Sequence, residues 1–529
     1  MSEIYSLHTF MFPFRWDKLH KGFKISDIKE NISFEHRTDL SKIEDNFGEW
    51  QRKKFIFTED GTKLLHENYN EFTYFHEFVQ KAIYDYDYPW KKDQEIVKYY
   101  EYKIEKHLDN EYIISYMECD ITVTLTLKID GISLHLFNTG VGILTYNLSN
   151  VNIKQKSFEH ILKINEYGRR MYPQFCGKDG IKNAQGVFLP KELQLKINSR
   201  LKTTTSFKFY EEIPLKIKPS EPYQLPEHIR ELFSEKFIFA MTENPLDEEK
   251  ILITKVTDDR MFFLSWYGDE FISRKIGNKF KTNGDIEDNW MYAFIFGDKA
   301  IKNSIANLKM NKKQLEKHTY RRWIEWKTIY GISRDSFVCL TDEGDFTKDN
   351  ILVAMQTMYY AISVLCLAQR ASILKFTAEV ANLADLAKIE NEKDLVTNIK
   401  EVYKNYIEFV NKLYFREVTS QIQGIELYNQ FQKLMNIEKE INNMDKEINE
   451  LHQYVSLLQE TKRSEQAEKL NLIAAIFLPA TIMFGILGSN FLESNNFYFQ
   501  NGIDGHKMLW ILIGFLPSIL VLIFLKLKK

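Results

Sequence analysis

The sequence predicts an α+β domain, with helices and a mostly antiparallel sheet, followed by a long stalk helix and two C-terminal transmembrane helices. Three observations predict this organisation. The first part of the chain interleaves β-branched strand patterns with helical ones. The stretch from Asp345 to Phe484 holds one glycine and one proline and is rich in helix-forming residues. Two long uncharged runs then lie close to the C-terminus.

The composition describes a mostly water-soluble chain without a strong charge bias. The 529 residues are enough for two or three domains, and the mean hydropathy is -0.35. The net charge of -3 argues against a protein that binds DNA or RNA directly. The N-terminus lacks the basic and apolar regions of a signal peptide. The cysteines follow no metal-ligand spacing and suit a reducing compartment: Cys119, Cys176, Cys339 and Cys366.

Residues 1–345 are expected to form a cytosolic α/β domain that senses a ligand. Met117–Leu148 alternates and is dense in β-branched residues, which predicts an antiparallel meander with turns at Gly131 and Gly140. Further runs add strands near Lys54, Ile251 and Arg260 and a helix from Ser157.

Residues 346–469 are expected to form a helical bundle and a coiled-coil stalk. Apolar residues recur there at spacings of three and four, and no helix breaker separates them from the first uncharged run. The simplest interpretation is one helix from about Ile425 to Gly488, about 95 Å long. Its partners are other copies of the chain or the preceding helices. The seam comprises Leu427, Phe431, Leu434, Ile437, Ile441, Met444, Ile448, Leu451, Val455 and Leu458.

The two uncharged runs, 470–488 and 508–525, each match the thickness of a hydrocarbon core. Lysine and arginine precede the first run, and the basic tail 526–529 follows the second, so both ends are expected in the cytosol and the loop 489–507 outside. The alternative to two transmembrane helices is that the two runs form a buried helical hairpin of a soluble protein. A third uncharged run, Ile351–Ala368, contains several polar residues and is expected to be a buried helix of the soluble part.

One face of the first span carries small and polar residues. Small residues allow close helix packing, and asparagine and threonine avoid lipid, so this face either packs on a neighbouring helix or lines a channel. As a channel lining, the stripe supplies oxygen atoms for a cation at Asn471 and Thr481 and an apolar ring at Leu478. The stripe comprises Asn471, Ala474, Leu478, Thr481, Gly485 and Gly488.

The run KLNLIAAIFLPATIMFGILGSNF, Lys469–Phe491, resembles the first transmembrane helix of the CorA family of divalent-cation transporters. The resemblance extends more loosely to Arg416–Tyr428. It implies a homopentamer whose first spans line a central pore, with Mg²⁺ or a similar ion as the transported or regulatory cation. The Gly-Met-Asn signature of the family stands here as Gly488-Ser489-Asn490, which implies Asn490 as the metal-binding oxygen ring. Ser489 departs from the pattern and leaves magnesium selectivity open.

The size of the N-terminal domain and the altered tripeptide resemble a CorA-like branch found with type III CRISPR systems. That resemblance implies an antiviral membrane effector in the bacterial inner membrane, gated by a nucleotide second messenger such as a conjugate of S-adenosylmethionine with AMP. Two basic pairs are candidates for its phosphate, with neighbouring aromatic residues for the base. Surface arginines or structural ion pairs are the plainer interpretation. The candidates are Tyr167, Arg169, Arg170, Tyr320, Arg321, Arg322 and Trp323.

No catalytic signature accompanies these features, so neither an enzyme nor a catalytic cofactor is expected. The glycine-containing run at 177–186 lacks the end of a phosphate-binding loop, and the twelve histidines form no metal or triad signature. Two other functions stay open: a housekeeping transporter of Mg²⁺ or another divalent metal, and a non-conducting coiled-coil scaffold anchored in the membrane.

Overall fold

A computed structural model describes most of the chain, in two compact units, Met1–Ile448 and Asn449–Lys529. The described residues are 3–24, 38–55, 73–85, 95–105, 107–171, 189–198, 203–209, 225–239, 244–256, 260–283, 288–299, 307–386 and 392–488, with Leu516, Ile519 and Ile523.

The first unit is built on a mixed, mostly antiparallel sheet, as predicted. The order along its main path is β13-β14-β15-β12-β1-β7-β6-β4-β3-β2, and only β10–β11 and β12–β15 pair in parallel among the described strands. The strands are β1 Ser6–Leu19, β2 Asn46–Phe47, β3 Trp50–Arg52, β4 Val97–Tyr102, β5 Glu111–Glu118, β6 Ile121–Phe137, β7 Val141–Asn150, β8 Glu192–Ile197, β9 Thr203–Lys208, β10 Phe237–Ile238, β11 Lys250–Lys255, β12 Phe262–Gly268, β13 Thr319–Tyr320, β14 Ile329–Ile332 and β15 Ser336–Thr341.

The predicted meander is present as β5, β6 and β7, with one turn in an unexpected place. Gly140 adopts a φ of 78° in the turn between β6 and β7, as expected. The other turn forms at Cys119 and Asp120, both with positive φ, so the turn expected at Gly131 is wrong. Gly131 lies inside β6, where the register with β7 shifts. A glycine in a strand marks such a bulge as readily as a turn.

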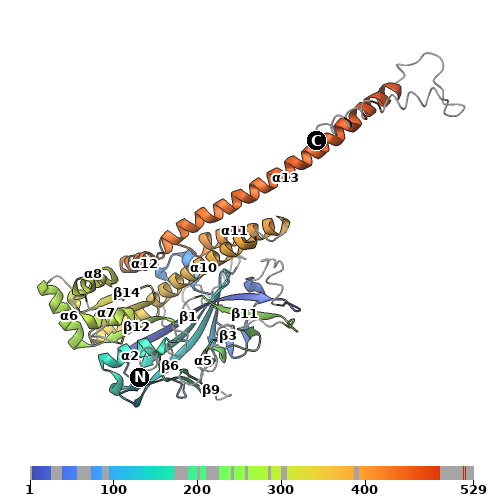
Figure 1. Ribbon diagram of the computed structural model, residues 1–529. Coiled ribbons are helices and arrows are strands. Elements are labelled where there is room, and N and C mark those ends of the chain that lie inside the picture. The colour runs from blue at the N-terminus through green and yellow to red at the C-terminus, as the bar shows by residue number, and fades with distance from the viewer. Residues whose placement is uncertain are drawn as a thin grey trace, which may run out of the picture. The chain divides into compact units, whose positions relative to one another are not determined.

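The helices of the first unit cover the sheet. Helix α10 lies along one face of the sheet, against β1 and β7, and α11 packs beside it (Figure 1). The described helices are α1 Glu77–Ile83, α2 Phe158–Gly168, α5 Glu227–Arg230, α6 Glu270–Asn283, α7 Asn289–Phe296, α8 Leu308–His318, a π-helical turn Thr347–Leu352, α9 Val353–Gln356, α10 Met358–Leu386, α11 Glu392–Lys412, α12 Ile422–Leu434 and α13 Ile437–Gly488, with short 3-10 turns at Leu40–Lys42, Ile153–Gln155 and Ile324–Trp326.

Among the fully described residues, the helical stretch Thr347–Leu383 is long and apolar enough to cross a membrane by length and composition. However, 67% of its most apolar window is buried inside the unit. This burial agrees with the expectation that Ile351–Ala368 packs in a soluble core. Several side chains in the last part of α13 lie outside the described set.

The long helix is shorter than predicted because it is interrupted at Asn436. Asn436 adopts a φ of 56°, and α13 starts only at Ile437, so the prediction of one helix from Ile425 is wrong. Asparagine tolerates this left-handed conformation, which commonly ends a helix. The backbone amide of Glu440 donates to the carbonyl of Asn436 at 3.0 Å and so begins the next helix.

The heptad seam is satisfied within one chain up to Ile448. Ile437, Ile441, Met444 and Ile448 are each at most 3% exposed. Tyr406 of α11 donates a hydrogen bond to Asp445 Oδ1 at 2.6 Å, beside this seam. The first turns of α13 therefore pack as an intramolecular helix pair.

Gly142 of β7 faces Phe14 of β1, and a Cβ atom there would collide with the Phe14 ring. We predict that Gly142→Ala destabilises the first unit by about 1–3 kcal/mol, because an extra methyl group in a well-packed core forces its neighbours out of place. Gly131→Ala is the matched control, because nothing lies within 4 Å of its Cβ position. The measurement is chemical unfolding of the purified chain in detergent, and equal effects of the two substitutions would contradict this packing.

Candidate functional site

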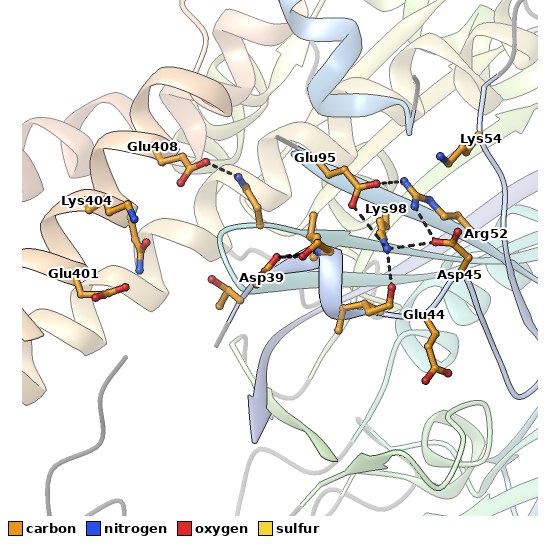
Figure 2. Close-up of a pocket in the computed structure, with 16 residues that line it drawn as sticks. Asp39, Glu44, Asp45, Arg52, Lys54, Glu95, Lys98, Glu401, Lys404 and Glu408 are labelled. Atoms are coloured by element: carbon orange, nitrogen blue, oxygen red, sulfur yellow. Dashed lines mark hydrogen bonds and ion pairs between the residues drawn. The ribbon is translucent and has the colours of Figure 1, made fainter. Parts of the chain in front are cut away.

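A charged cavity of about 920 Å³ opens between the sheet and α11. Figure 2 shows Glu401, Lys404 and Glu408 of α11 on one side of it, opposite residues from the β2–β4 region. Acidic residues outnumber basic ones on its walls. The charged lining comprises Asp39, Glu44, Asp45, Arg52, Lys54, Glu95, Lys98, Glu401, Lys404 and Glu408.

Arg52 at the end of β3 is held by three carboxylates. Its guanidinium donates two bonds to Asp85, at 2.6 and 2.7 Å, one to Asp45 at 2.8 Å and one to Glu95 at 2.7 Å. The side chains of Arg52 and Asp85 are only 6% and 3% exposed. Burial alone lowers the pKa of Arg52, but the hydrogen bonds to Asp85 and Asp45 outweigh it and raise the pKa. The guanidinium is therefore charged and fully engaged.

Lys98 of β4 and Glu408 of α11 complete the cavity walls. Lys98 Nζ donates to the carbonyl of Ile43 at 2.6 Å and to Asp45 Oδ1 at 3.3 Å. Across the cavity, Asn138 Nδ2 donates to Glu408 Oε1 at 3.2 Å. These bonds join the loop after β1, the sheet and α11, so the cavity marks a polar joint between segments that are distant in sequence. Its two most buried cations already have carboxylate partners, which leaves little positive charge for an anionic ligand.

The candidate pair Arg169–Arg170 lies in the core at the end of α2. Arg169 is 1% exposed, forms an ion pair with Glu166 at 3.3 Å and donates to the carbonyl of Gly297 at 2.9 Å; Arg170 also contacts Glu166. Burial raises the pKa of Glu166, but the charges of Arg170 and Arg169 outweigh it and hold the pKa below its ordinary value. Burial lowers the pKa of Arg169 to about 10. Tyr167, the expected stacking residue, is buried against Tyr116.

The second candidate pair is tied to α12. Arg322 donates to Glu426 at 2.6 and 2.9 Å, and Tyr320 donates to the same carboxylate. Arg321 donates to Thr319 Oγ1 at 2.7 Å, and Trp323 Nε1 donates to Gln423 at 2.7 Å. No described contact joins this group to the Arg169–Arg170 pair. The arginines of both groups thus already have internal partners.

The candidate pore residues up to Gly488 all lie on one helix, α13. At 100° per residue their six positions fall within an arc of about 100° of the helix circumference. Thr481 Oγ1 donates to the carbonyl of Phe477 at 2.9 Å, so its hydroxyl proton is satisfied by its own helix. Ser489 and the metal-ligand candidate Asn490 lie outside the described residues, as does most of the second span.

Sequence reasoning missed the charged cavity altogether. Its ion pairs join Arg52 to Asp85 and Glu95, which lie 33 and 43 positions away in the sequence. No local spacing pattern predicts such pairs. Within the described residues no group of three or more histidine, cysteine, aspartate or glutamate side chains could hold a metal ion.

Comparison with known proteins adds no assignment, since no family model and no curated protein matches the chain.

We predict that Glu166→Gln destabilises the protein by about 3–5 kcal/mol, because it leaves two buried arginines without their shared carboxylate. The matched control is Glu426→Gln, which removes the partner of Arg322 in a pair whose side chains are both 38% exposed. Its expected cost is about 0–1 kcal/mol. Chemical unfolding of the full chain in detergent measures both, and a mild effect of Glu166→Gln would contradict the structural role of Arg169 and Arg170.

Proposed function

We propose that this chain is the subunit of a membrane cation channel, with 470–488 as its pore-lining span and residues 1–448 as its cytosolic control domain. The proposal has three supports: the exposure of apolar residues on α13, the polar stripe on the same helix, and the contact of its first turns with α11.

The observation that carries the proposal is the apolar surface around the end of α13. Six large apolar side chains there are between 41% and 68% exposed in the single chain. At 100° per residue they point to all sides of the helix, so one packing partner along one face does not cover them. A bilayer does. The six are Leu470, Leu472, Ile473, Phe477, Leu478 and Ile482.

The stripe from Asn471 to Gly488 supports a pore within that bilayer. It gathers both polar residues of the span, Asn471 and Thr481, and three small residues on one face, where neighbouring copies of the helix pack closely around an axis. The side-chain amide of Asn471 and the second lone pair of Thr481 Oγ1 supply oxygen atoms for a cation on that axis.

The start of α13 supports control from the first unit. Tyr406 OH lies within hydrogen-bond distance of Asp445 Oδ1, at 2.6 Å, and of the carbonyl of Ile441, at 3.3 Å, both on α13. Helix α11 in turn packs on α10, which covers the sheet. A ligand that shifts α10 and α11 against the sheet thereby shifts the base of the pore helix.

The resemblance to the CorA family adds the finer part of the proposal. It implies five copies around the axis, a divalent cation as the permeant ion, and Asn490 at the outer mouth. The resemblance to the branch associated with type III CRISPR systems implies antiviral defence in the bacterial inner membrane, with a nucleotide second messenger as the gating ligand.

One observation favours a second candidate, the non-conducting membrane anchor. Because Thr481 satisfies its hydroxyl within the helix, it tolerates a lipid-facing position. On that alternative the spans only tether the first unit, and no ion moves.

Flux through reconstituted protein separates the two functions. We predict that liposomes with the full chain and a nucleotide ligand pass divalent cations, and that Thr481→Leu or Asn471→Leu changes the flux at least roughly tenfold, which corresponds to about 1.4 kcal/mol of barrier. Leu472→Ile on the opposite face is the matched control and should leave the flux unchanged. Flux no higher than in empty liposomes, in the presence of folded protein, would favour the anchor.

A further inference from the structure

A second cavity, of about 170 Å³, lies between the sheet and α10, and five aromatic rings form part of its lining. The rings come from segments far apart in sequence: the loop shortly after β3, the end of α1, strands β4 and β6, and α10. They are Phe55, Tyr84, Tyr99, His135 and Tyr360.

His135 is one of the residues that line this cavity. The residue is 4% exposed, and its ring centroid lies 4.8 Å from that of Tyr99 and 6.3 Å from that of Tyr360. Among the described residues, its buried Nδ1 atom has no hydrogen-bond partner. Burial lowers the pKa of His135 to about 3, so the ring is neutral at physiological pH. A buried polar atom without a partner is destabilising, and a ligand that forms a hydrogen bond with it removes that cost.

The two tyrosine hydroxyls, in contrast, are engaged with the protein. Tyr99 OH donates to Glu101 at 3.2 Å, and Tyr360 OH lies 3.3 Å from Ser133 Oγ and 3.4 Å from Thr145 Oγ1. These bonds fix the rings in place. Fixed aromatic faces beside one unpaired nitrogen suit a planar heteroaromatic ring, which stacks and forms a directed hydrogen bond at its edge.

A polar cavity of about 390 Å³ adjoins the aromatic one and shares Tyr99, Glu101 and Gln356 with it. Lys53 and Lys103 line this second space and are exposed. In the described part of the chain neither ammonium group has an ion-pair partner, unlike Arg52 and Lys98 in the charged cavity. Glu101 and Asp130 also line this space, but Glu101 accepts a hydrogen bond from Tyr99 and Asp130 forms an ion pair with Lys128. The two lysines therefore suit an anionic chain attached to the ring.

We propose that the two adjoining cavities form one binding site for a heteroaromatic ring that carries an anionic chain, such as a purine mononucleotide. The ring stacks on Tyr99 and Tyr360 and forms a hydrogen bond with His135 Nδ1. The anionic chain lies in the polar cavity against Lys53 and Lys103.

The position of this site links it to the rest of the first unit. Tyr360 belongs to α10, and Tyr99 receives support from Asp85, whose Oδ2 accepts the Tyr99 backbone amide at 3.1 Å and also bonds Arg52. A bound ring therefore joins α10 to the sheet beside the charged joint with α11. The assignment rests on the proposed ligand control for its physiological meaning, while ligand binding itself is measured without any ion flux.

The test is calorimetric titration of the full chain in detergent with AMP, adenosine and ribose 5-phosphate. We predict that AMP binds more tightly than adenosine and that ribose 5-phosphate binds weakest. His135→Phe keeps a ring but removes the nitrogen, and should weaken AMP and adenosine alike by roughly 2–10-fold. The double variant Lys53→Gln, Lys103→Gln should weaken AMP and leave adenosine unchanged. Lys309→Gln, an exposed lysine on α8, is the matched control.

Three outcomes would overturn the site: no heat with AMP at millimolar concentration, equal affinity of AMP and adenosine, or unchanged adenosine binding in a folded His135→Phe variant. A melting curve of each variant establishes that it is folded, and the lysine variant reports on the site even where His135→Phe does not fold. AMP binding without any effect on cation flux supports the site and counts against the proposed channel control alone.

Discussion

The exposed apolar circumference of α13 after Lys469 is the constraint on which the functional account depends. Each large apolar side chain left in water rather than buried costs about 1.5–3 kcal/mol. Six such side chains on 470–488 together cost an amount comparable with the whole stability of a domain. No single helix partner removes this cost, because the side chains point in all directions. The segment therefore requires an apolar environment on every side, and the polar stripe is then the one face that is out of place in lipid.

In the first unit, by contrast, the strands and helices bury a continuous apolar core. Its sheet, α10 and α11 border two cavities of opposite character, and Asp85 links them because it accepts hydrogen bonds from both Arg52 and the backbone amide of Tyr99. In the charged cavity the two most buried cations are already paired. Among the described residues, the buried His135 Nδ1 atom beside the aromatic cavity has no hydrogen-bond partner, and Lys53 and Lys103 in the adjoining polar cavity have no ion-pair partner. We therefore assign a structural role to the charged cavity and ligand binding to the aromatic one. Both cavities lie against the helices that hold the base of α13.

The sequence predicted the parts of the fold that depend on local patterns. The meander, the helix α2 and the buried helix α10 follow from alternation, a helical residue pattern and the position of polar residues within an apolar run. Gly131 and Asn436 show the limit of that reasoning, because a glycine in a bulge resembles one in a turn, and an asparagine in a left-handed cap resembles one inside a helix. The functional residues were harder to predict from the sequence than the fold. Arg169 and Arg170 were candidates because they are two adjacent basic residues. However, Glu166, one helical turn away, forms ion pairs with both of them. His135 gave no signal, because its significance arises only when β4, β6 and α10 come together.

The most direct test of the account is the water accessibility of single cysteines along 470–488 in reconstituted membranes, in a background with Cys119 and Cys176 replaced by serine. The account predicts that a polar thiol reagent modifies cysteines at Asn471, Ala474 and Thr481, which face the pore, and spares those at Leu472, Ile473 and Phe477, which face lipid. Modification at all six positions would show that the helix lies in water and would contradict the membrane assignment. Protection at all six would leave the helix in the bilayer without a pore and would contradict conduction.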